Sequence, residues 1–107
     1  MKEYPTIKSL EEFRQIISGE NSVMVYFSND HCQVCKVLKP KVFHLVQKNY
    51  PKVSFFYVDT INNPEIAGQN TIFTVPVIVV FQHGKELLRK ARTISLDEIM
   101  TELERFG

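Results

Sequence analysis

Three largely apolar runs, at residues 23–27, 53–58 and 77–81, are separated by segments with helical periodicity. Runs of this length without polar alternation are typical of strands buried on both faces. Because helices stand between them, the pattern predicts an α/β protein with parallel pairing of these strands and helices on both faces of the sheet. A turn at His83-Gly84 before a charged run indicates a final antiparallel hairpin. The expected sheet is therefore mixed, with a mostly parallel core.

The expected helices carry recognisable start signals. Ser9 and Ser95 each stand three residues before a glutamate, which is the pattern of a capping box at a helix N-terminus. Asn63, followed by proline, suits the start of a short helix. A short first strand is expected at residues 4–7, where Pro5 interrupts it.

Length and charge limit the number of domains and the class of partner. A chain of 107 residues and 12.5 kDa corresponds to one domain over residues 1–107. Thirteen Lys and Arg against twelve Asp and Glu leave a net charge of +1, which attracts neither nucleic acid nor an anionic membrane. Neither a signal peptide nor a transmembrane span is recognisable in the sequence. We therefore expect a cytoplasmic monomer without nucleic-acid or membrane partners.

The two cysteines stand in the motif Cys32-Gln33-Val34-Cys35, where a predicted buried strand gives way to a helix. The free amides at a helix N-terminus carry partial positive charge, which stabilises a thiolate at Cys32. Cys35 follows one turn later on the same side, within reach of a disulfide with Cys32. Because so short a loop constrains the unfolded chain little, the pattern favours redox chemistry over stabilisation.

Three other interpretations of the cysteine pair stay open. Both residues could pack as small apolar core side chains, or form a structural bridge, which a reducing compartment disfavours. They could also supply half of a zinc site completed by His31, His44 or His83, although no two histidines stand at the spacing of a zinc-binding pair. We expect no metal and no other cofactor.

Further motifs stand in a fixed order around the cysteine pair. They are Lys36 with Pro40 four residues beyond it, Val58-Asp59 at the end of the second run, Thr74-Val75-Pro76 before the third, and His83-Gly84. Together with the Cys-x-x-Cys, this ordered set resembles the thioredoxin family over nearly the whole chain. The resemblance implies the thioredoxin fold, with its central mixed sheet flanked by helices.

The resemblance also implies a thiol–disulfide oxidoreductase that acts on protein disulfides. Cys32 attacks the target disulfide, and Cys35 then displaces the reduced target. A cis Val75-Pro76 bond beside the disulfide is expected, with the Val75 backbone pairing with an extended substrate segment. His31 borders the substrate groove, and a flavin disulfide reductase is the expected electron donor.

The active-site motif departs from that of the family at several positions. Thioredoxins read Trp-Cys-Gly-Pro-Cys, whereas here His31 replaces the tryptophan and Gln33-Val34 replaces Gly-Pro. The reduction potential therefore cannot be carried over from the family. A protonated His31 would help to hold a thiolate at Cys32; the alternative is an ordinary solvated loop residue.

Tyr26 and Arg92 are two further departures. Thioredoxins carry a buried aspartate at the Tyr26 position, where it assists proton transfer to and from the second cysteine. With an ordinary pKa near 10, tyrosine is a poor base at neutral pH, so water or another group must handle the proton of Cys35, or exchange is slow. Alternatively, Tyr26 fills the core with its hydroxyl hydrogen-bonded. Arg92 stands where a glycine lines the groove, and either narrows it or is simply solvated.

Two alternatives to a thioredoxin-like reductase are kept. The fold could serve as a partner-binding module with little redox turnover, because fold alone does not assign function. A glutathione-linked glutaredoxin also carries Thr-Val-Pro, but its Cys-x-x-Cys follows the first strand and a Gly-Gly pair follows the proline-led strand. Here a helix and a strand are predicted before Cys32, and Gly84 stands alone, which favours thioredoxin.

Overall fold

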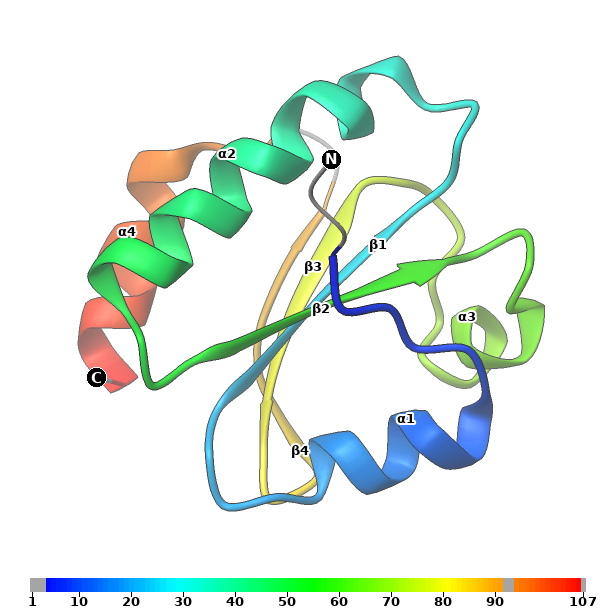
Figure 1. The fold of residues 1–107 in the computed structure, drawn as a ribbon, viewed down its shortest axis with the longest axis horizontal. Helices are drawn as coiled ribbons and strands as arrows, with labels where there is room; N and C mark the ends of the chain where they lie inside the picture. The colour runs from blue at the N-terminus through cyan, green and yellow to red at the C-terminus, as the bar shows by residue number, and fades with distance from the viewer. Residues whose placement is uncertain (1–3, 92–93, 107) are drawn as a thin grey trace.

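The computed structural model of the chain describes residues 4–91 and 94–106 (Figure 1). In these ranges four helices and four strands follow one another along the chain. They are α1 (Leu10–Ile17), β1 (Val23–Ser28), α2 (Gln33–Asn49), β2 (Ser54–Asp59), α3 (Pro64–Gln69), β3 (Val77–Gln82), β4 (Lys85–Ala91) and α4 (Leu96–Phe106). No helix in the described part of the chain is long and apolar enough to cross a membrane.

The strands form one mixed sheet in the order β2-β1-β3-β4. β1 and β2 are parallel, with Val23 opposite Ser54. β3 lies antiparallel to β1, with Phe27 opposite Val77, and β3 and β4 form an antiparallel hairpin. The expected mixed sheet and its C-terminal hairpin are therefore confirmed.

The predicted parallel pairing of all the buried strands is wrong for β3. The reason lies in the helix of the connection from β2 to β3, since residues 60–76 are numerous enough to cross the sheet but their one helix is short. α3 has six residues, which rise only about 9 Å along a helix, whereas a six-residue strand spans about 20 Å. The chain therefore stays at the end of the sheet where β2 finishes, and β3 enters from that end in the opposite direction (Figure 1).

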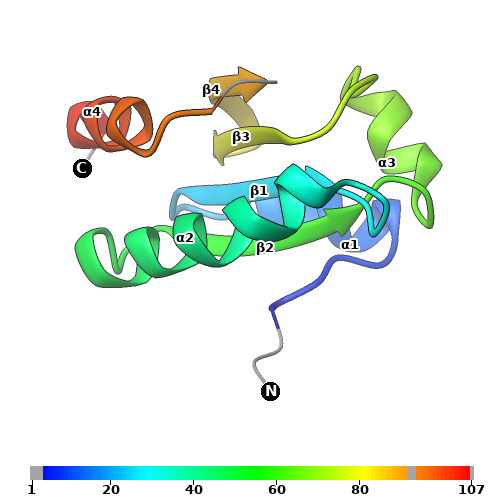
Figure 2. The ribbon, with the colours of Figure 1, turned by 90° about the horizontal axis from the view of Figure 1, so that it is seen from above.

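Helices cover both faces of the sheet, as predicted (Figures 1 and 2). Met24 and Tyr26 of β1 belong to the core between the sheet and helices α2 and α4, together with Val42 and Ile99. The alternate residues of β1 belong to a second core under α1 and α3. Because successive side chains of a strand point to opposite faces, an apolar run is what two such cores require.

Of the residues described before α1, those at 4–9, the structure pairs one with the sheet, through a single bridge. The strand expected at residues 4–7 is reduced to a parallel bridge between Thr6 and Tyr57. The Tyr57 amide donates to the Pro5 carbonyl at 2.8 Å, and the Ile7 amide donates to the Tyr57 carbonyl at 2.9 Å. Pro5 has no amide proton to extend this ladder, which explains why the strand is so short.

Candidate active site

A tight turn after β1 places Cys32 at the start of α2. The side-chain oxygen of Asn29 accepts a hydrogen bond from the His31 amide at 2.9 Å, and the Asn29 carbonyl accepts from the Cys32 amide at 3.3 Å. The Cys32 carbonyl then accepts from the Lys36 amide at 3.2 Å, which is the first helical hydrogen bond. Asparagine is suited to such a turn because its side chain can bond to the backbone two residues on.

Cys32 and Cys35 are joined by a disulfide, with their Cα atoms 5.2 Å apart. Cys32 is the N-cap residue of α2, and its Sγ accepts a hydrogen bond from the Cys35 amide at 3.1 Å. This amide is one of those left free at a helix N-terminus, where negative charge is stabilised. The expected juxtaposition of the two cysteines at a strand-to-helix junction is thus confirmed.

The two sulfur-bearing residues differ in exposure. Cys35 is only 1% exposed and packs in the core formed by α2, α4 and the sheet, whereas Cys32 is half-buried at the edge of that core. One cysteine can therefore meet a partner while the other is shielded. Thiol–disulfide exchange through a mixed disulfide needs this asymmetry.

The Val75-Pro76 peptide bond is cis, as predicted. Pro76 is buried, and Val75 packs against the same core as Cys32 and Cys35. The ladder between β1 and β3 begins only at Val77, so the Val75 backbone lies outside the paired sheet. The sequence motif and the cysteine pair therefore meet at one region of the molecule.

The thioredoxin family profile matches residues 5–105 of the chain. The chain belongs to the thioredoxin family. Family membership and the paired cysteines support a thiol–disulfide oxidoreductase in general terms.

Named relatives agree with this assignment. Thioredoxin-like protein YdfQ of Bacillus subtilis is 30% identical over 105 residues, which cover 98% of this chain and 93% of that protein. Mitochondrial thioredoxin-2 of Schizosaccharomyces pombe is 32% identical over 89 residues, covering 83% of this chain and 66% of that protein. The solved structure of Malassezia sympodialis thioredoxin matches 100% of this chain and 96% of its own, with a TM-score of 0.87. At 21% identity, this last likeness shows the fold alone.

Tyr26 is the residue at which the family resemblance implies a buried aspartate. Its side chain is fully buried, and its hydroxyl donates to the Cys35 carbonyl at 2.9 Å. Burial raises the pKa of Tyr26, and the neighbouring Tyr57 and Tyr4 raise it further. The hydroxyl therefore stays protonated at neutral pH and cannot take up the proton of Cys35. The interpretation of Tyr26 as a hydrogen-bonded core residue is confirmed.

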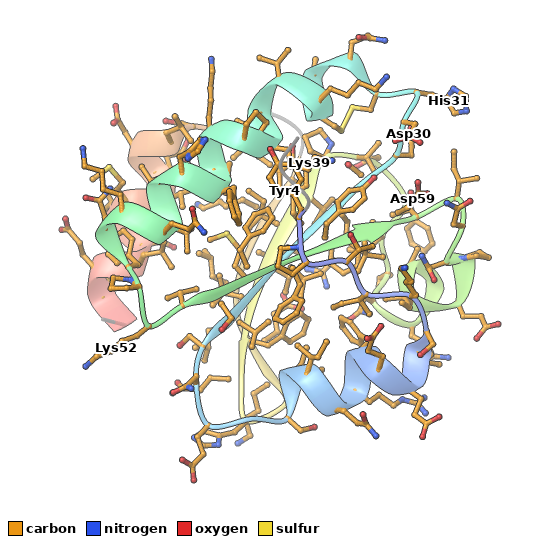
Figure 3. The ribbon with its side chains drawn as sticks, viewed as in Figure 1. Tyr4, Asp30, His31, Lys39, Lys52 and Asp59 are labelled. Atoms are coloured by element: carbon orange, nitrogen blue, oxygen red, sulfur yellow. A yellow bond between two sulfur atoms is a disulfide. The ribbon has the colours of Figure 1, made fainter. Side chains whose placement is uncertain are left out.

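His31 lies in the turn before Cys32 and is exposed. Its imidazole points outward, away from Lys39 and Asp59 (Figure 3). Among the described residues, no three His, Cys, Asp or Glu side chains gather in a group that could hold a metal ion. Arg92, the residue predicted to alter the groove, lies outside the described residues.

Sequence reasoning missed Phe73, two residues before Val75, and Lys39, on the same helix as Cys35. Phe73 is 82% exposed and lines a surface hollow of about 360 Å³ together with Val75. A bulky aromatic directly before Thr74-Val75-Pro76 was the available signal. Lys39 has its ammonium over the rings of Tyr57 and Tyr4, a contact between distant segments for which the sequence carries no local signal.

Proposed function

We propose that this protein reduces disulfides of other proteins through the Cys32–Cys35 couple. The observation that carries the proposal is the disulfide at the start of α2, with a half-buried Cys32 and a buried Cys35. The Cys35 amide aimed at the Cys32 sulfur adds to it. A nucleophilic cysteine needs an accessible sulfur and is activated at a helix N-terminus, whereas a structural bridge requires neither.

The reaction proceeds in two exchange steps. The Cys32 thiolate attacks one sulfur of the target disulfide, forms a mixed disulfide and releases the other target sulfur as a thiolate, which water protonates. Cys35 then loses its proton and attacks the Cys32 sulfur. The Cys32–Cys35 bond forms, the bond to the target breaks, and the second target sulfur leaves as a thiolate. Two electrons pass to the target, and the protein is left oxidised.

A target segment docks beside the Val75-Pro76 bond. Because the Val75 backbone lies outside the sheet ladder, it can pair with an extended peptide as an added strand would. The exposed ring of Phe73 offers apolar contact on one side, and His31 borders the other. We assign these residues to substrate binding.

The reduced state must be regenerated, and we propose a flavin disulfide reductase as the electron donor. The activity needs no cofactor bound to this chain and no more than the single domain over residues 1–107. We further propose that the protein works as a monomer in the cytoplasm, where a reducing pool keeps such a couple available. Subcellular fractionation and size-exclusion chromatography test these two points.

Trapping tests the proposal directly. The Cys35→Ser variant keeps the nucleophile but cannot resolve the mixed disulfide, so it should accumulate covalent adducts with a disulfide-bonded protein. The Cys32→Ser variant is the matched control and should form none. Turnover of a disulfide-linked peptide by the wild type, supplied with dithiothreitol, completes the test. No adducts and no turnover would contradict the proposed reductase.

Tyr26 favours one alternative, a partner-binding module with little redox turnover. Its buried, protonated hydroxyl leaves the position of the family's proton acceptor without a base. If the protein binds partners through the same face but exchanges disulfides no faster than free dithiothreitol, this alternative replaces the reductase.

A further inference from the structure

Lys39 is a partly buried cation on the redox helix. It lies on α2, and its Nζ stands 4.0 Å from the centre of the Tyr57 ring and 4.8 Å from that of Tyr4. Figure 3 shows Lys39 beside Tyr4. An ammonium over an aromatic face is attracted by the negative charge of the ring, and this attraction grows as water is excluded. Two rings from different segments therefore fix the position of this charge.

The same charge lies on the sheet side of the cysteine pair. Cys35 and Lys39 are four residues apart on one helix, so their side chains project from the same face. Cys35 packs in one core cluster with Tyr26 and Tyr57, and Lys39 covers the Tyr57 ring. Tyr26, whose hydroxyl donates to the Cys35 carbonyl, stands directly opposite Tyr57 in the sheet. The ammonium therefore lies over the neighbour of the residue that contacts Cys35.

Several other charged or titratable groups act on Lys39, and each segment packed against it contributes. They are Asp30 in the turn after β1, Asp59 at the end of β2, Lys36 on α2 itself, and the phenols of Tyr57 and Tyr4. Burial lowers the pKa of Lys39, whereas the two carboxylates oppose that effect and favour the charged form.

These neighbours leave the ammonium available to a new negative charge. One oxygen of Asp59 already accepts the amides of Ile61 and Asn62, at 2.9 and 3.0 Å. Asp30 and Lys36 are exposed, so water screens their charges. A thiolate formed on the buried side of the cysteine pair would therefore attract Lys39 with little competition from the exposed charges.

The resolving step needs such a charge. Cys35 attacks as a thiolate, and its burial disfavours that charged form. Tyr26 cannot supply compensation, because its hydroxyl is a neutral donor held by the Cys35 carbonyl. A fixed positive charge about one helical turn away, in a partly water-excluded place, stabilises the thiolate.

We propose that Lys39 is a positioning residue of the redox couple, whose ammonium, held over Tyr57 and Tyr4, stabilises the Cys35 thiolate that resolves the mixed disulfide. This inference rests on the proposed function. The Cys35 proton passes to water, the Cys35 sulfur attacks the Cys32 sulfur, and the target sulfur leaves as a thiolate. Lys39 forms and breaks no covalent bond in this step.

Single-turnover kinetics with dipyridyl disulfide tests the inference. The reduced protein first reacts at Cys32 in a bimolecular phase, and Cys35 then releases the second pyridine thiol in a unimolecular phase. The reagent is uncharged, so loss of a lysine leaves its encounter with the protein unaffected. Both phases are followed across a pH range for the wild type, Lys39→Met, Lys39→Arg and Lys41→Met. Lys41 is exposed on the same helix and gives the matched loss of charge.

Lys39→Met should raise the pH midpoint of the unimolecular phase by about one unit, which slows it about tenfold below the midpoint. Lys39→Arg, which keeps the charge, and Lys41→Met should stay within about twofold of the wild type. Thermal melting checks that each variant is folded, and Lys39→Gln replaces Lys39→Met if the latter is not.

Two kinds of failure are distinguishable in this experiment. A wild type without a unimolecular phase contradicts the proposed reductase and the role of Lys39 together. A wild type that resolves normally, with Lys39→Met at the same midpoint, overturns the Lys39 inference alone. Equal slowing by Lys41→Met also overturns it, because the position of the charge would then not matter. Slowing by Lys39→Arg as large as that by Lys39→Met overturns it too, because the charge itself would then not be the cause.

Discussion

The hydroxyl of Tyr26 donates a hydrogen bond to the main-chain carbonyl of Cys35 at 2.9 Å, inside the core. The bond ties β1, an inner strand of the sheet, to the first turn of α2, which presents the disulfide. Because the phenol is fully buried and stays protonated, it acts as a fixed donor. Tyr26 is thus a structural tie between the sheet and the redox helix.

Removing this tie should cost stability without changing the pH dependence of exchange. Tyr26→Phe deletes one buried hydrogen bond and should lower the free energy of unfolding by about 1 kcal/mol. Urea denaturation measures it as a lower midpoint at constant slope. Tyr50→Phe is the control, since Tyr50 donates to the Met100 carbonyl at 3.1 Å, far along the chain from the cysteines. If Tyr26→Phe moves the pH midpoint of exchange, Tyr26 takes part in proton transfer.

The raised pKa of Tyr26 predicts an alkaline weakening of the wild type. In the unfolded chain Tyr26 ionises near its ordinary pKa of about 10, whereas in the folded protein it stays protonated to higher pH. A group with a raised folded pKa contributes stability that is complete below its unfolded pKa and lost above it. The stability advantage of the wild type over Tyr26→Phe should therefore shrink as the pH rises above about 10. Urea titrations on both sides of that pH measure it, and a constant difference would contradict the assigned pKa direction.

Much of the fold could be predicted from local sequence signals. The helix predicted to open at Asn63-Pro64 is found as α3, starting at Pro64, because proline at the first helical position acts locally. The Asn63 side chain makes no cap hydrogen bond and donates instead to the Asp59 carbonyl at 3.1 Å. The orientation of β3 could not be predicted this way. It depends on the path of residues 60–76 between β2 and β3, which a pattern of apolar runs does not contain.

Only those parts of the candidate site that are formed by residues close together in the chain could be predicted from the sequence. The disulfide between Cys32 and Cys35 follows from a spacing of three residues at a helix start. The partners of Tyr26 and Lys39 were not predictable, since each contact joins segments that only the folded chain brings together.

The cap of α1 offers a test of a predicted local element. The Ser9 hydroxyl oxygen accepts from the Glu12 amide at 3.1 Å, and the Glu12 carboxylate accepts from the Lys8 amide at 2.7 Å. Ser9→Ala should lower the free energy of unfolding by about 1 kcal/mol. Ser18→Ala, at the exposed C-terminal end of the same helix, should change it by at most about 0.5 kcal/mol. Equal losses in urea denaturation would contradict the capping role, and disulfide exchange should be unaffected in both variants.

Phe73 should matter for protein substrates and not for small ones. Its ring is 82% exposed beside Val75, and an exposed aromatic of this kind contributes nothing to the folded core. Phe73→Ala should leave stability within about 0.5 kcal/mol and raise the KM for a disulfide-bonded protein about three- to tenfold, through lost apolar contact. The rate with dipyridyl disulfide should stay the same, because this small reagent has no peptide segment to dock beside Val75.

Leu87→Ala is the matched control for this experiment, because Leu87 is a partly exposed apolar residue on the edge strand β4. It should leave the KM for the protein substrate unchanged. An equal rise in KM for both variants would indicate a general effect of lost apolar surface. An unchanged KM for Phe73→Ala would place the bound substrate away from this ring. A slower reaction of Phe73→Ala with dipyridyl disulfide would instead show that the ring shapes the cysteine pair itself.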